Sequence, residues 1–62
     1  MTRDSVEAHV QMILEHIANI EMYSHRVRDD ADHYSRLICA ETLAIAGHAR
    51  ELRAAARTIA AA

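Results

Sequence analysis

Apolar side chains recur along the first half of this chain at alternating steps of four and three residues. This spacing has a period of 3.5 residues, which is typical of a helix that packs lengthwise against another helix and is incompatible with a β-strand. Met12, Leu14 and Ala18 widen the apolar face, so we expect neighbours on more than one side. The positions that keep the step are Val6, Val10, Ile13, Ile17, Ile20, Ser24 and Val27.

The second half repeats this spacing, although two of its positions are polar. The positions are Tyr34, Ile38, Glu41, Ile45, His48, Leu52, Ala55 and Ile59. The stretch from Leu37 to Ala46 is apolar on nearly all sides, which indicates a helix covered by partners. One glycine and no proline in 62 residues leave little that would interrupt a helix. The sequence therefore predicts an all-α fold.

Aspartates cluster between the two halves, at Asp29, Asp30 and Asp32. Aspartate is a poor residue inside a helix and a good N-cap, so Asp30 or Asp32 can start a second helix. We predict one domain over 1–62, with helices over about 4–28 and 33–60 and a hinge over about 29–32. Asp4 is the expected cap of the first helix. The uninterrupted spacing also allows one continuous helix, which we consider the weaker alternative.

A single hairpin of this size cannot enclose a core, because small chains bury too little of their surface. We therefore expect an antiparallel two-helix hairpin that self-associates, as a homodimer, into a four-helix bundle. The residues predicted to form its core and interface are Val6, Val10, Ile13, Ile17, Ile20, Val27, Tyr34, Ile38, Ile45, Leu52 and Ile59.

Composition excludes several classes of protein. The net charge of −2 argues against a general nucleic-acid binder. A single cysteine, Cys39, excludes an internal disulfide and is predicted to be a reduced, buried core residue. Charged residues near the N-terminus and within the longest apolar stretch argue against a signal peptide and a membrane span. We expect a cytoplasmic protein.

Five histidines are many for a chain of 62 residues. His9, His16 and Tyr23 lie seven residues apart along one edge of the first helix, and Glu41 and His48 are also seven apart. Carboxylates and imidazoles inside a helical bundle can bind a metal, so Glu41 and His48 form an alternative metal site. We favour the simpler interpretation, in which they are buried polar residues that pair across the bundle. No metal and no other cofactor is predicted.

Two segments resemble HEPN-fold proteins of the HepT type, the helical partners of minimal nucleotidyltransferases in bacterial toxin–antitoxin pairs. Arg3-Asp4 followed by Met12–Tyr23 is similar to the opening helix of that family. Leu43–Leu52, with Gly47 in the glycine position, resembles the next helix. The resemblance covers the first half of the family's domain and implies a truncated form, without the helix that carries the usual ribonuclease motif.

The favoured function is therefore protein–protein interaction, with a second copy or with a nucleotidyltransferase-like or larger helical protein. A minimal HEPN-like ribonuclease is the alternative. Arg28 and His33 fit the family's Arg-x4-His pattern, with Tyr34 beside them. In that case His33 is the base and Arg28 stabilises phosphate charge. Three aspartates nearby repel a polyanion, which disfavours this alternative.

Overall fold

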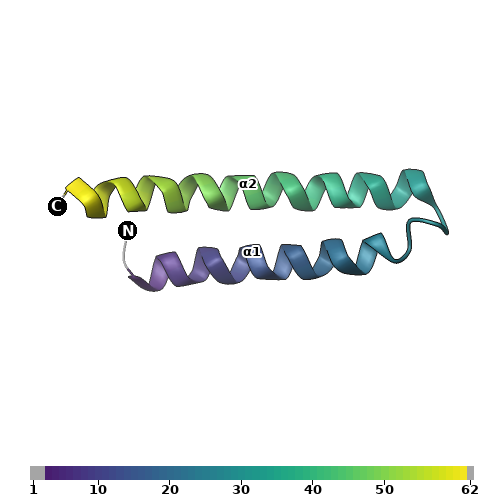
Figure 1. Ribbon diagram of the computed structural model, residues 1–62, viewed down its shortest axis with the longest axis horizontal. Coiled ribbons are helices and arrows are strands. Elements are labelled where there is room, and N and C mark those ends of the chain that lie inside the picture. Colours follow the sequence, from purple (N-terminus) through teal and green to yellow (C-terminus); the bar gives the residue numbers. More distant parts are fainter. Residues whose placement is uncertain (1–2, 62) are drawn as a thin grey trace.

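The computed structural model describes residues 3–61, which form two antiparallel helices lying side by side (Figure 1). Helix α1 spans Arg3–Ser24 and helix α2 spans Ala31–Ala61. The hairpin measures 50 × 15 × 11 Å, and no strand occurs within residues 3–61. The predicted all-α hairpin is confirmed, and the alternative of one continuous helix is wrong. Figure 1 also shows that α2 extends beyond the start of α1 at the open end.

The connection between the helices lies over residues 25–30, earlier than the predicted hinge at 29–32. Helix α1 ends at Ser24, whose hydroxyl donates a hydrogen bond of 2.7 Å to the carbonyl of Glu21. The amides of Arg26 and Asp29 each donate to a carbonyl three residues back, at 2.9 Å. Bonds to the third preceding residue tighten the chain beyond α-helical geometry, so these turns end the helix without glycine or proline.

Asp30 caps the second helix. Its side-chain Oδ1 accepts a hydrogen bond of 3.1 Å from the amide of His33, and its carbonyl accepts one of 3.1 Å from the amide of Tyr34. An N-cap oxygen satisfies an amide that has no partner inside the helix, so the helix begins where this aspartate stands. Of the two aspartates predicted to be able to start the second helix, Asp30 and Asp32, it is Asp30 that caps it. Helix α1 begins at Arg3, so Asp4 lies in the first turn of that helix.

Replacing Asp30 with alanine is expected to destabilise the hairpin by about 1 kcal/mol, because the amide of His33 loses its partner. Urea unfolding followed by circular dichroism measures this loss. Asp29→Ala is the matched control, since Asp29 is also exposed but makes no side-chain bond to the start of α2. Equal losses in the two variants would contradict the cap.

Burial within one hairpin is slight. Ala55, 4% exposed, is the one buried residue among those that the structure describes. Of the predicted core and interface residues, three are exposed: Val10 at 42%, Ile17 at 41% and Ile59 at 66%. The half-buried ones are Val6, Ile13, Ile20, Val27, Tyr34, Ile38, Ile45 and Leu52.

The prediction that Cys39 is buried is wrong, because its side chain is exposed. Leu43, one turn further along α2, is 72% exposed. Residues four apart lie on the same side of a helix, so Cys39 and Leu43 mark a side of α2 that α1 does not cover. The nearly all-round apolar character of this part of α2 is what made the covered side ambiguous in the sequence.

Candidate functional site

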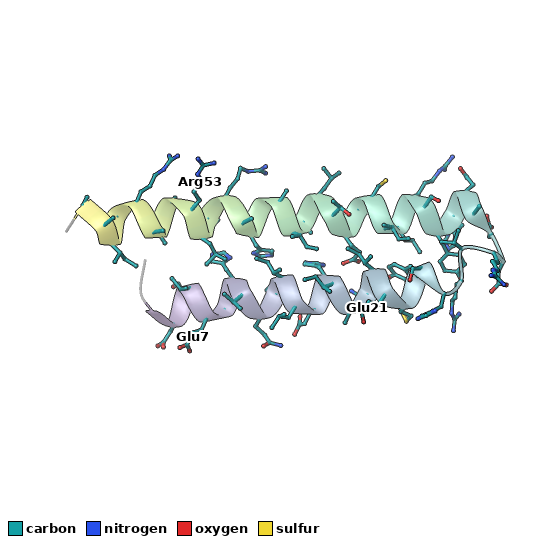
Figure 2. The ribbon with its side chains drawn as sticks, viewed as in Figure 1. Glu7, Glu21 and Arg53 are labelled. Atoms are coloured by element: carbon teal, nitrogen blue, oxygen red, sulfur yellow. The ribbon has the colours of Figure 1, made fainter. Side chains whose placement is uncertain are left out.

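The inner face of the hairpin carries polar and aromatic side chains in three cross-helix pairs. These pairs are His9 with His48, His16 with Glu41 and Tyr23 with Tyr34. Each step of seven residues along α1 is matched by a step of seven back along α2, as an antiparallel arrangement requires. Figure 2 shows side chains from both helices filling the space between the ribbons. We call these three pairs the inner pairs.

His9 and His48 form the inner pair at the open end. Their Nδ1 atoms are 2.7 Å apart, and their ring centroids are 5.0 Å apart with the rings tilted by 53°. A neutral imidazole has one nitrogen that donates and one that accepts. This contact is therefore a hydrogen bond in which one ring supplies the proton and the other a lone pair.

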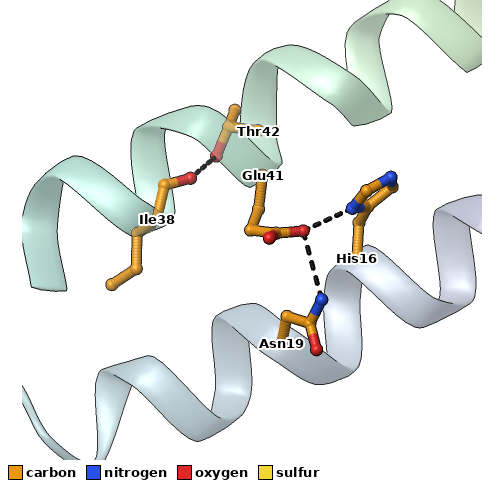
Figure 3. Close-up of polar contacts among 5 residues, drawn as sticks. All are labelled: His16, Asn19, Ile38, Glu41 and Thr42. Carbon is orange, nitrogen blue, oxygen red and sulfur yellow. Dashed lines mark hydrogen bonds and ion pairs between the residues drawn. The ribbon is translucent and has the colours of Figure 1, made fainter.

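His16 and Glu41 form the middle pair (Figure 3). Nδ1 of His16 donates to Oε2 of Glu41, and Nδ2 of Asn19 donates to the same oxygen over 3.4 Å. The His16 hydrogen bond is the main cause that holds the pKa of the Glu41 carboxyl below its ordinary value, and Asn19 adds to it while desolvation opposes it. Both side chains are largely shielded, being 19% and 17% exposed. Glu41 is therefore an ionised hydrogen-bond acceptor inside the hairpin.

The rings of the first two pairs also touch each other. His16 lies over His48 with ring centroids 5.8 Å apart and an angle of 28° between the rings. Three imidazoles, from His9, His48 and His16, thus follow one another and end at the carboxylate of Glu41. The third pair, Tyr23 and Tyr34, has ring centroids 6.1 Å apart and joins the helices near the turn.

Within one hairpin, Glu41 and His48 each contact a histidine of α1, and both are half-buried. Their predicted pairing across a bundle stays a prediction. The spacing predicts His9 and His16 at the edge of the packed face, whereas they lie within it. The partners of the two histidines were missed. One signal in the sequence could have found them. His9 and His16 are seven residues apart, as are Glu41 and His48, and an antiparallel hairpin sets the first of one pair against the second of the other.

The ribonuclease alternative finds no assembled site. Arg28 and His33 are both exposed, and no hydrogen bond or ion pair joins them within the part of the chain that the structure describes. The His33 ring packs edge-on against Tyr34, with centroids 4.9 Å apart. No pocket is present over residues 3–61 that would hold a substrate.

The metal-binding alternative also has no assembled site in the described residues. Among residues 3–61, no group of three or more histidine, cysteine, aspartate or glutamate side chains is arranged to hold an ion. Nδ1 of His48 contacts His9, and the carboxylate of Glu41 contacts His16, so the two proposed ligands point to different partners. The inner pairs are thus contacts between helices, made by hydrogen bonds in two pairs and by a ring contact in the third.

Neither α1 nor α2 is long and apolar enough, over the described residues, to cross a membrane. Comparison with protein-family models, with curated proteins and with solved structures finds no match for this chain. The HEPN resemblance and every functional assignment therefore rest on the residues themselves.

Proposed function

We propose that this chain is a helical interaction module that self-associates through an apolar stripe on the outside of α1. The observation that carries the proposal is a row of large apolar side chains on the outer side of α1. Val10, Leu14 and Ile17 follow the 3.5-residue spacing, yet they are 42%, 53% and 41% exposed. The side chains shielded by α2 are instead His9 and His16, together with half-buried Val6, Ile13 and Ile20. A face of this kind is a packing surface whose partner lies outside the hairpin.

The energetics of a lone hairpin support the same proposal. With one buried residue among those described, the chain buries little apolar area against the entropy of ordering two long helices. Covering the outer stripe with another helix adds apolar burial at about 25 cal/mol per Å². Association is therefore the expected source of much of the stability of this fold.

The distribution of charge favours a second copy as the occupant. Helix α1 carries four carboxylates and one arginine. Glu7 and Glu21 continue the spacing of the apolar stripe at its two ends. The last part of α2 carries Arg50, Arg53 and Arg57 with a single glutamate. Figure 2 shows Glu7 and Arg53 on opposite outer sides of the hairpin. The carboxylates that flank the apolar stripe of one copy are complementary to the arginines of another copy. Two α1 helices, in contrast, repel each other.

Sedimentation equilibrium tests this proposal. At about 10 µM protein, we expect a species of at least twice the 6.9 kDa mass of the chain, which dissociates on dilution. Added salt is expected to weaken the association, because part of the complementarity is between exposed charges. A folded monomer at that concentration would overturn the proposal. Folding only in the presence of another protein would instead indicate a hetero-partner, such as the nucleotidyltransferase that the HEPN resemblance implies.

A further inference from the structure

The hydrogen bond between His9 and His48 depends on the number of protons that the pair holds. Over a 2.7 Å separation of the two Nδ1 atoms, one proton lies between two nitrogens. If both of these nitrogens are protonated, both are donors and no acceptor remains, and two positive charges face each other. The contact therefore exists only while at least one of the two rings is neutral.

Side-chain contacts link this pair to His16 of α1, whose ring stacks on His48, and through His16 to Glu41 of α2, beyond which lie Tyr23 and Tyr34. Glu7 and Glu51 flank the pair in the sequence and are exposed. Oε2 of Glu41 is already bonded to His16. With all three imidazoles protonated, three positive charges share one carboxylate.

We propose that the His9–His48 pair is a proton-operated latch that holds the open end of the hairpin when neutral and releases it when both rings are protonated. Histidine is the side chain whose ordinary titration lies nearest neutral pH, so mild acidification is the trigger. The tyrosine pair, whose rings pack against each other, keeps the helices together near the turn. The released state is thus a hairpin that opens from the end opposite the turn.

The sign of the effect follows from proton linkage. In the unfolded chain the two imidazoles are apart and both bind protons freely, whereas in the hairpin the second proton costs the hydrogen bond. Because the unfolded state binds more protons below about pH 6.5, stability falls as the pH falls. The His16–Glu41 pair adds stability through the ionised carboxyl of Glu41. Its contribution is lost only at lower pH, as Glu41 becomes protonated through its lowered pKa.

The experiment compares the full chain with His48→Gln and with His33→Gln as the matched control. Glutamine offers His9 a neutral hydrogen-bonding partner that takes up no proton. His33 is exposed and contacts only its neighbour Tyr34 through its ring. Urea unfolding at a fixed protein concentration, at steps between about pH 7.5 and pH 5.5, gives the unfolding constant of each protein.

We expect the unfolding constant of the full chain and of His33→Gln to rise by up to about tenfold per pH unit below pH 6. In His48→Gln this rise is expected to disappear. The proposal is overturned if His48→Gln keeps the full pH dependence, or if the unmodified chain shows none. Because the comparison is made at one concentration, it reports on the latch whether or not the chain self-associates.

A second measurement does not depend on unfolding. In an NMR titration of the imidazole rings, His9 of the full chain is expected to titrate over a range broader than one site, because its proton affinity depends on His48. In His48→Gln the same ring is expected to titrate as a single independent site. Identical titration curves for His9 in the two proteins would contradict a shared proton.

Discussion

Aspartate at both Val10 and Ile17 is expected to raise the dissociation constant of the self-associated chain about 100-fold. Each apolar side chain contributes roughly 1.5 kcal/mol when buried, so the loss of two amounts to about 3 kcal/mol. The new carboxylates add repulsion, because α1 already carries four acidic residues. Sedimentation over a dilution series measures the change.

The matched control places aspartate at Gln11 and Ala18, which are also exposed and also seven residues apart on α1. This variant has the same added charge, but it leaves Val10, Leu14 and Ile17 in place. Because alanine and glutamine are better helix formers than valine and isoleucine, the control loses at least as much helix propensity as the test variant. It is expected to associate at most severalfold more weakly than the unmodified chain. If both double variants weaken association equally, charge and not the stripe controls the interaction.

Exchanging the two residues of the middle inner pair is expected to lower the unfolding temperature in the single variant and to restore most of it in the double variant. His16→Glu places a second carboxylate against Glu41, in a position where both original side chains are less than one-fifth exposed. The unfolding temperature at neutral pH is therefore expected to fall clearly. Adding Glu41→His restores an imidazole beside a carboxylate, with the two helices exchanged, and is expected to recover most of the loss.

This double-mutant cycle separates a specific pair from two unrelated positions. For positions that do not interact, the double variant is as unstable as the two single variants combined. Such additivity would contradict the contact between His16 and Glu41. The single Glu41→His variant completes the cycle and places two histidines opposite each other, as in the pair at the open end.

The sequence was sufficient to predict the helices because the spacing of Val6, Ile13 and Ile20 is local information. Asp30 was equally informative, since capping depends on a residue and the amides that follow it. The turn was placed too late because α1 ends through hydrogen bonds at Ser24 and Arg26, and neither residue is a strong helix breaker. Exact helix ends depend on such weak local preferences.

The rotation of α1 about its own axis was harder to predict. Hydrophobicity alone directs Val10 and Ile17 inward, but in the hairpin His9 and His16 occupy that face. The inner side chains are stabilised by partners in α2, and that information lies up to 39 residues away in the sequence. Periodicity identifies an apolar face without stating which helix covers it, which is also why the exposure of Cys39 was missed.

The inner pairs have a consequence for the turn itself. Two copies of α1 placed antiparallel about His16 would set His9 opposite Tyr23, which preserves neither the imidazole pair nor the tyrosine pair. The inner pairs therefore match α1 to α2 better than they match α1 to a second α1 in that register. Residues 25–30 then serve mainly to raise the local concentration of one helix near the other. The chain is a suitable source for a split pair of peptides in which the covalent link has been removed and side-chain complementarity alone directs assembly.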